Sequence, residues 1–342
     1  MQNINSIILA IESSCDDTSC AVLRNNVVLS NITAGQKIHE QYGGVVPELA
    51  SRDHQKHMVP VVEAALKKAG IKMTDITAIA VTSGPGLMGS LLVGLSFAKS
   101  MALALGVPLI GVNHMQGHIL AHFIREEQKD DKELPEFPFL CLTVSGGHTQ
   151  LVKVNAHLSF ELMGETIDDA VGEAFDKAAK ILGLPYPGGP LIDKLAREGD
   201  KNKFKFATTN VGGYDYSFSG IKTSFLYFIR DRVKEDPDFV SKNMHDICAS
   251  YQHHLVSVLL KNARKVLKET DIKQFAIAGG VSANSELRRQ VEELKEEGFR
   301  IFVPKFEYCT DNAAMIGVTA YYKFLNGDFS ALDLVPEVRM GL

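Results

Sequence analysis

The chain has 342 residues, of which 45% are hydrophobic and 23% charged, and its net charge is −5. This length suits two domains of a globular enzyme, and the acidic balance excludes a protein that binds nucleic acid over its whole surface, although a local basic patch stays open. The five cysteines are scattered and the N-terminus lacks a basic region, so we expect a reducing, cytoplasmic location without a signal peptide.

The first part of the chain alternates between expected strands and helices. The apolar and β-branched runs predict strands at residues 6–12, 18–23, 27–32, 76–81 and 107–112. The helical patterns cover residues 47–69, 90–105 and 114–125, and residues 39–44 are expected to be a loop. Lys99 and the Gly106-Val107-Pro108 break make the apolar run 90–112 a buried helix and strand, not a membrane span.

The second part begins after a charge run, residues 126–133, which is the expected linker. A strand, turn and second strand at residues 139–154 repeat the opening pattern, which indicates a weak internal duplication. The later pattern predicts a helix at 166–182, a rigid loop at 183–190, irregular aromatic segments at 201–206 and 212–220, two or three helices within 221–269, a strand at 274–278, a helix at 285–297, a strand at 300–303 and a helix at 311–325.

Small residues on the 311–325 helix predict close packing, and we expect it to return to the first domain. The fold class is therefore α/β. The expected domains are residues 1–133 plus 312–342, and residues 134–311 with helical insertions.

Three glycine-marked turns leave apolar strands, at residues 83–86, 145–147 and 279–284. Glycine allows close approach of a ligand, and consecutive backbone N–H groups favour anions. None of the turns is a P-loop or a full dinucleotide fingerprint. One turn per half favours a nucleotide or phosphorylated ligand, with an ordinary turn as the alternative at each position.

His114 and His118 are four residues apart on an expected helix, so both imidazoles can face one metal ion. Asp311 is first of all a helix-start residue, and as a third ligand it would leave open positions for substrate oxygens. Packed or surface histidines are the alternative. Asp16 and Asp17 in the first turn, and Asp176 and Asp193 around the 183–190 loop, are either ligand anchors or solvated carboxylates.

Taken together, the motifs are similar to those of a known family. They are Ile11-Glu-Ser-Ser-Cys-Asp-Asp-Thr-Ser, Pro47-Glu-Leu-Ala-Ser-Arg-Asp-His, Ser83-Gly-Pro-Gly-Leu, Asn113-His-Met-Gln-Gly-His, Val144-Ser-Gly-Gly-His-Thr, Gly164-Glu-Thr-Ile-Asp-Asp-Ala-Val-Gly-Glu-Ala-Phe-Asp-Lys, Tyr186-Pro-Gly-Gly-Pro, Tyr216-Ser-Phe-Ser-Gly-Ile-Lys-Thr, Gly279-Gly-Val-Ser-Ala-Asn and Cys309-Thr-Asp-Asn. In this order, over nearly the whole chain, the sequence resembles the bacterial tRNA threonylcarbamoyladenosine transferases (TsaD-like, formerly called glycoproteases) of the actin-like, sugar-kinase and heat-shock ATPase superfamily.

The resemblance implies two ribonuclease-H-like domains with a cleft between them. It implies transfer of a threonylcarbamoyl group from threonylcarbamoyl-AMP to the N6 amine of adenosine 37, in tRNAs that read codons beginning with A. It further implies one divalent metal, Fe²⁺ favoured and Zn²⁺ as the alternative, held by His114, His118 and Asp311. The positions that match the family's substrate site are Thr143, Val144, Ser145, Gly146, Gly147, Asp176, Gly189, Asp193 and Asn284.

The implied partners are tRNA, an inactive paralogue (TsaB), an ATPase (TsaE) and an upstream adenylate-forming enzyme (TsaC-type), with no membrane. The apolar helix from Gly89 to Leu105 is a candidate docking face, although a buried core helix explains its pattern as well. Candidate tRNA-phosphate contacts, with solvated faces as the alternative, are Lys201, Lys203, Lys205, Arg264, Lys265 and Lys268.

Three other functions compete with this interpretation. A metallopeptidase would carry an acid next to the first histidine, where this chain has Met115. A small-molecule kinase of the same superfamily would not need the two histidines and the aspartate. A non-catalytic scaffold of the same fold would have no use for a complete set of metal ligands.

Overall fold

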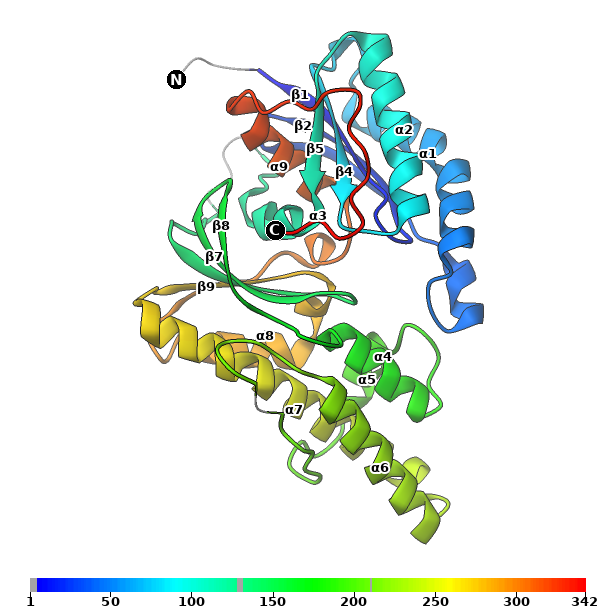
Figure 1. The fold of residues 1–342 in the computed structure, drawn as a ribbon, viewed down its shortest axis with the longest axis vertical. Coiled ribbons are helices and arrows are strands. Elements are labelled where there is room, and N and C mark those ends of the chain that lie inside the picture. The colour runs from blue at the N-terminus through cyan, green and yellow to red at the C-terminus, as the bar shows by residue number, and fades with distance from the viewer. Residues whose placement is uncertain (1–4, 128–131, 210) are drawn as a thin grey trace. The chain divides into compact units, whose positions relative to one another are not determined.

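The computed structural model describes residues 5–127, 132–209 and 211–342, which form two compact units (Figure 1). Unit 1 contains Met1–Pro135, Ala156–Ser159 and Pro304–Leu342, and unit 2 contains Glu136–Asn155 and Phe160–Val303. Residues 304–311 lie in unit 1, where Lys305 and Tyr308 bind the carboxylate of Glu126. The core of the linker expected at 126–133, residues 128–131, lies outside the described residues.

Unit 1 is built on a mixed sheet in the order β3-β2-β1-β4-β5, with β1 antiparallel to β2 and parallel to β4. Its elements are β1 (Ile7–Glu12), β2 (Thr18–Arg24), β3 (Val27–Ala34), η1 (Lys37–Tyr42), α1 (Pro47–Ala69), η2 (Met73–Asp75), β4 (Ala78–Gly84), α2 (Met88–Leu105), β5 (Leu109–Asn113), α3 (His114–Leu120), η3 (Ala121–Phe123), η5 (Phe306–Tyr308) and α9 (Ala313–Leu325). The five expected strands are confirmed, and the 39–44 loop is largely the short helix η1.

Helix α1 shows why the sequence was informative here. Pro47 occupies its first turn, where a missing N–H costs nothing, and Gly70 ends it in the left-handed conformation at φ 66°. Helices α1 and α2 pack together on one face of the sheet, and α3 and α9 cover the other (Figure 1). Helix α9 therefore lies in unit 1, in contact with β1 and β2.

Among the described residues, one helix, α2, is long and apolar enough to cross a membrane. It packs instead against α1 and β4, and the chain turns at Gly106 into β5. One third of the helix, 33%, is buried, while Met88, Leu92 and Leu103 are exposed. The helix is therefore a layer of the domain that keeps one apolar face uncovered.

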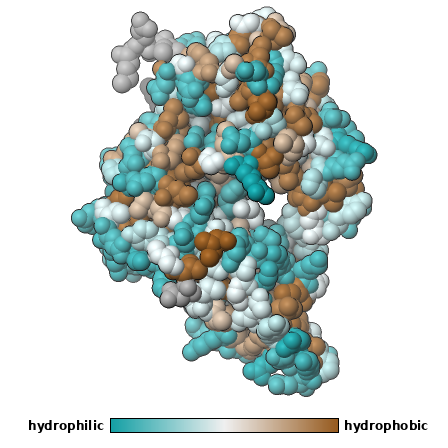
Figure 2. Space-filling view, in the orientation of Figure 1, coloured by the Kyte–Doolittle hydropathy of each residue, from teal (hydrophilic) through white to brown (hydrophobic). Residues whose placement is uncertain are grey.

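Residues 328–342, here called the strap, run along β5 from its first residue, Leu109, to its last, Asn113, and contact the carboxyl end of β4. Ser330 pairs with Leu109, and Glu337 N–H donates to the Ser83 carbonyl over 2.8 Å. A Cβ on Gly84 would lie 2.0 Å from the Glu337 carbonyl oxygen, so the strap requires a glycine there. Figure 2 shows apolar side chains over the part of unit 1 along which the strap and α2 run in Figure 1.

Unit 2 has a sheet in the order β10-β9-β6-β7-β8, with β6 antiparallel to β7 and parallel to β9. Its elements are β6 (Phe139–Val144), β7 (Thr149–Ala156), β8 (Ser159–Glu165), α4 (Val171–Ile181), α5 (Gly188–Ala196), α6 (Ser219–Glu235), α7 (Phe239–Thr270), β9 (Gln274–Ala278), η4 (Gly280–Ala283), α8 (Ser285–Glu293) and β10 (Arg300–Phe302). Each unit thus has a central α/β sheet in the described residues, which confirms the predicted fold class.

Three sequence predictions were wrong in detail. Residues 166–182 are helical only from Val171, and strand β8 precedes them. The 183–190 loop already contains the start of α5, which no local pattern predicted. The helix expected at 114–125 is α-helical only to Leu120 and continues as the short helix η3.

Candidate metal centre and substrate site

The three predicted metal ligands lie in unit 1, on the side of the sheet covered by α3 and α9. His114 and His118 occupy α3, which follows β5, and Asp311 precedes α9 by two residues. The two helices pack closely at Gly117, where a Cβ would lie 3.1 Å from Ile316 Cδ1. This packing brings one ligand atom from each of the three residues within 4.8 Å of the others.

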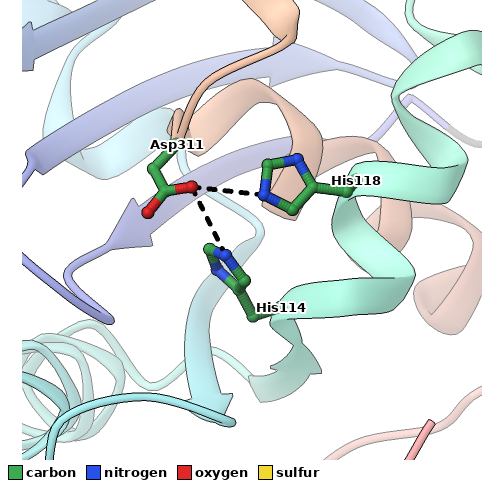
Figure 3. Close-up of side chains that lie close together, drawn as sticks. All are labelled: His114, His118 and Asp311. Atoms are coloured by element: carbon green, nitrogen blue, oxygen red, sulfur yellow. Dashed lines mark hydrogen bonds and ion pairs between the residues drawn. The ribbon is translucent and has the colours of Figure 1, made fainter. Parts of the chain in front are cut away.

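The three side chains point at one another (Figure 3). Asp311 Oδ1 lies 3.2 Å from His118 Nε2 and 3.4 Å from His114 Nε2. Both imidazoles are buried, at 7% and 1% exposure, while a quarter of the Asp311 side chain, 25%, is open. This donor set consists of two imidazoles and one carboxylate on one side of a possible ion. It suits Fe²⁺ or Zn²⁺ and leaves the other coordination positions open.

Glu12, at the end of β1, orients His114 and was not predicted as a site residue. Its Oε2 accepts from His114 Nδ1 at 3.0 Å and from Thr82 Oγ1 at 2.5 Å, and its Oε1 accepts from the Ser14 N–H at 2.5 Å. The Nδ1–H tautomer leaves His114 Nε2 free for a metal. The sequence signal for this role was an acid directly after the continuous apolar run of residues 7–11, and the structure adds that this acid is fully buried.

The charges around His114 explain its protonation. Burial opposes a charge on its ring, but Glu12 and Asp311 outweigh burial and raise the pKa of His114 well above its ordinary value. Burial also works against ionisation of Asp311, yet His114 and His118 lower the pKa of this carboxyl. Since a metal ligand must be neutral imidazole, a cation would take the place of the His114 proton.

Asp17 adds negative charge to the same region. Burial, and then the charges of Asp311, Asp16 and Glu12, raise the pKa of Asp17 to about 7. These carboxylates repel one another, and a divalent cation at the triad would relieve that repulsion. The ionisation of Asp17, one of the two acids singled out in the first turn, therefore depends on the site.

The predicted substrate residues all lie in unit 2, at the carboxyl end of β6 and around it. Thr143 and Val144 end the strand, and Gly146 and Gly147 are exposed with open space where a Cβ would stand. Gly279 follows the neighbouring strand β9 at φ 85°, and a Cβ there would lie 2.4 Å from the Val144 carbonyl oxygen. The two glycine turns are therefore in direct contact.

The predicted acids of unit 2 have partners of their own. Asp176 Oδ1 accepts from the N–H groups of Gly188 and Gly189, at 2.8 and 3.3 Å, and so caps α5. Burial raises the pKa of Asp176 despite these two bonds. Asp193, on α5, accepts from the Ser285 N–H at 3.0 Å, which joins it to the start of α8.

Asn284 caps α8 through the Leu287 N–H at 3.0 Å, and its amide donates to Gln252 Oε1 at 2.8 Å. Ser285 thus links its chain neighbour, Asn284, to its hydrogen-bond partner, Asp193. Helix α5 connects this pair to Asp176, because it carries Gly189 in its first turn and Asp193 further along. These contacts thus link Asp176 to Asp193 through α5 and Asp193 to the start of α8 through Ser285, while Gly279 links the 279–284 turn to Val144.

A cavity of about 410 Å³ opens beside Asp193 and Asn284. Two of its lining residues are hydrogen-bond partners of this pair: Gln252 binds Asn284, and Ser285 binds Asp193. The other lining residues are Ala196, Arg197, Gly199, Lys201, Ala249, Glu286 and Arg289. Sequence reasoning named Lys201 as a phosphate contact and missed the rest, because the cavity is formed by α5, α7 and α8 together. Its volume lies in the range of small-molecule pockets, and two of its three cations are held by acids, Arg197 by Asp193 and Arg289 by Glu286.

Two of the proposed tRNA-contacting cations are held by acids of unit 2. Lys203 pairs with Asp246 at 2.7 Å, and Arg264 pairs with Glu297 at 3.0 Å. These ion pairs favour the solvated-face alternative for both residues.

Comparison with known proteins gives a consistent family. The family model described as TsaD, tRNA N6-adenosine threonylcarbamoyltransferase, matches residues 27–318. Among similar curated proteins, the tRNA N6-adenosine threonylcarbamoyltransferase of Christiangramia forsetii is 61% identical over 99% of this chain and 98% of its own length. The protein of the same description from Porphyromonas gingivalis is 57% identical over 98% of both chains.

Solved structures are similar in fold at low identity. Full-length HypF in its phosphate- and nucleotide-bound form superimposes with a TM-score of 0.62 at 14% identity, over 95% of this chain and 47% of HypF. Component A of the (R)-2-hydroxyglutaryl-CoA dehydratase of Acidaminococcus fermentans gives a TM-score of 0.53 at 14% identity, over 94% and 99% of the two chains. At these identities the likeness concerns the fold alone.

Proposed function

Because the chain belongs to the tRNA N6-adenosine threonylcarbamoyltransferase family, we propose that it transfers threonylcarbamoyl from threonylcarbamoyl-AMP to N6 of adenosine 37 in tRNAs that read codons beginning with A. The product is N6-threonylcarbamoyladenosine. The N6 amine attacks the acyl carbonyl carbon, the bond from this carbon to the phosphate oxygen breaks, and AMP leaves together with the proton that the amine loses. The observation that carries the metal assignment is the convergence of His114, His118 and Asp311.

Unit 2 would hold the adenylate. The backbone of residues 143–147 offers N–H groups and close approach, and Gly279 lets the two turns lie together. The cavity beside Asp193 and Asn284 is large enough for the adenosine part, with Arg197, Lys201 and Arg289 at its wall. In this proposal Asp176 acts by holding Gly188 and Gly189 at the start of α5, and does not need to touch the ligand.

Unit 1 would hold one divalent metal on the two histidines and Asp311, with iron favoured and zinc as the alternative. When bound, the metal supplies Lewis-acid polarisation of an acyl or phosphoryl oxygen. Glu12 keeps the Nδ1 proton on His114 and so keeps its Nε2 available. The target base must leave its stack to reach any such site, as is usual for chemistry on single-stranded bases.

Partner proteins are part of the proposal. The exposed apolar residues of α2, Met88, Leu92 and Leu103, are a docking face for the inactive paralogue. The ATPase and the adenylate-forming enzyme complete the set, and the location is cytoplasmic.

Adjacent to the first histidine stands Met115, so the acid that a zincin-type peptidase requires is missing.

Reconstitution with tRNA, threonine, bicarbonate, ATP and the partner proteins tests the function. We expect wild-type protein to form the modified base, and we expect His114→Ala and Asp311→Ala to lose both activity and bound metal in elemental analysis. His245→Ala, which removes an exposed histidine of unit 2, is the control. Modification at the wild-type rate by either site variant would refute the metal assignment.

A further inference from the structure

The strap reaches the metal-binding helix through one side chain, Asn113. This residue ends β5 and directly precedes His114. Its Oδ1 accepts from the N–H groups of Met115 and Gln116, at 2.8 and 3.2 Å, and so caps α3. Its Nδ2 donates to the carbonyl oxygen of Gly341 in the strap, over 2.6 Å. The amide is thus divided between the helix and the strap.

Helix α3 has little rigidity of its own. It spans only His114–Leu120, and short helices are marginal without outside support. The direction of both imidazoles depends on where this helix begins, because His114 is its first residue and His118 lies one turn further. A bond that prevents the Asn113 side chain from rotating therefore fixes the start of the helix relative to Asp311.

The strap is itself anchored along its length. Glu337 N–H binds the Ser83 carbonyl at 2.8 Å, and the Val338 carbonyl accepts from Gly86 N–H at 3.3 Å. At its other end, Ser330 Oγ accepts from Gly111 N–H at 3.0 Å. Gly341 is therefore presented to Asn113 by a segment bound to the same two strands, β4 and β5, and not by a free tail.

We propose that Asn113, held by the Gly341 carbonyl, is a positioning residue that orients His114 and His118 toward Asp311 for metal binding. The inference rests on the proposed metal site. It gives the strap a role beyond covering the sheet: it sets the affinity of a site formed by residues that it does not touch. The Asn113 side-chain oxygen caps helix α3, and the Gly341 carbonyl of the strap fixes the Asn113 side chain.

The test separates the cap from the strap. Asn113→Ser keeps a good helix cap but has no N–H to give to Gly341, and a chain lacking residues 340–342 loses the acceptor. We measure the dissociation constant for Zn²⁺ by competition with a chromophoric chelator, and the unfolding midpoint of the metal-free protein. Each change should weaken Zn²⁺ binding about 2- to 10-fold, the loss expected for one hydrogen bond.

The combined variant should bind Zn²⁺ no more weakly than the weaker single variant, because both changes break the same bond. Ser330→Ala, which loosens the opposite end of the strap, should lower the unfolding midpoint and leave Zn²⁺ affinity unchanged. If either single variant fails to fold, the other single variant carries the test. Wild-type affinity in folded Asn113→Ser or in the shortened chain, or multiplied losses in the combined variant, overturns the proposal.

His114→Ala distinguishes an error in the proposed metal site from an error in the positioning role of Asn113. If it binds Zn²⁺ as tightly as wild type, the metal site itself is wrong. If it loses Zn²⁺ while folded Asn113→Ser and the shortened chain keep wild-type affinity, only the positioning role is wrong.

Discussion

Replacement of Glu12 by glutamine tests how the metal site is prepared before a metal arrives. The side chain is fully buried, and its two oxygens accept from three donors: Ser14 N–H, Thr82 Oγ1 and His114 Nδ1. Glutamine keeps the shape but replaces one acceptor oxygen with an N–H₂ group. That N–H₂ group must face either the Ser14 N–H or the pair formed by Thr82 Oγ1 and His114 Nδ1, all of which are donors to the carboxylate.

Either orientation of the glutamine damages the site. If the N–H₂ group faces Ser14, two donors oppose each other in a buried position. If it faces His114, the imidazole must accept at Nδ1, and its proton moves to Nε2, the atom that would bind the metal. Loss of an orienting partner of a metal-bound histidine typically weakens metal binding about 10- to 100-fold, which is roughly 1.4–2.7 kcal/mol.

The assay is metal affinity by chelator competition, together with the unfolding midpoint of the metal-free protein. Glu48→Gln, at a carboxylate of α1 whose side chain is 75% exposed, is the matched control and should bind metal like wild type. A folded Glu12→Gln variant with affinity within about 2-fold of wild type would refute the tautomer argument.

Four further predictions follow from the packing and the charges. Gly84→Ala should destabilise unit 1 by about 1–3 kcal/mol in denaturant unfolding, since its Cβ would lie 2.0 Å from the Glu337 carbonyl oxygen. Gly279→Ala should weaken the binding of a non-hydrolysable adenylate, measured by calorimetry, because the new Cβ would lie 2.4 Å from the Val144 carbonyl oxygen and push the two turns apart. Gly298→Ala is the control, since Gly298 also has a positive φ but its Cβ would meet nothing within 4 Å. Burial opposes the ionisation of Glu286, but Arg289 and His253 lower its pKa from 4.5 to about 2. The ionised acid therefore stabilises the fold above pH 4.5, and this effect is lost as pH falls toward 2. Glu286→Gln should lower the free energy of unfolding by about 2–3 kcal/mol at pH 7 and by little at pH 2. Metal at about 100 times its dissociation constant should raise the free energy of unfolding of wild type by about 2.7 kcal/mol and that of Asp311→Ala by much less, in thermal unfolding.

Local sequence patterns predicted most of unit 1 because its elements carry their own signals. Helix α1 begins at a proline and ends at a glycine, and its predicted bounds, Pro47–Ala69, are those observed. Helix α5 has no such signal, since its first residues are glycines and its cap is Asp176 from α4, twelve residues earlier. A local pattern cannot show a cap supplied by another element.

The same distinction applies to the sites. The spacing of His114 and His118 predicted that both could face one ion, but their relation to Asp311 depends on the packing of α3 against α9. Glu12 escaped notice because its partner lies 102 residues further along the chain. The lining of the unit 2 cavity could be recognised only once three helices, α5, α7 and α8, had been placed.

The order of the ligands along the chain has a consequence for biosynthesis. His118 and Asp311 are 193 residues apart, and the whole of unit 2 lies between them. Closing a flexible loop of that length costs about 4–5 kcal/mol of chain entropy, so the triad cannot assemble cheaply before unit 2 has folded and brought its ends together. A ribosome-bound chain that stops before Asp311 has the two histidines, lacks the third residue of the proposed site, and has a sheet face that α9 does not yet cover. In the proposed site, tight metal uptake would thus require that synthesis has passed Asp311 and that unit 1 is closed.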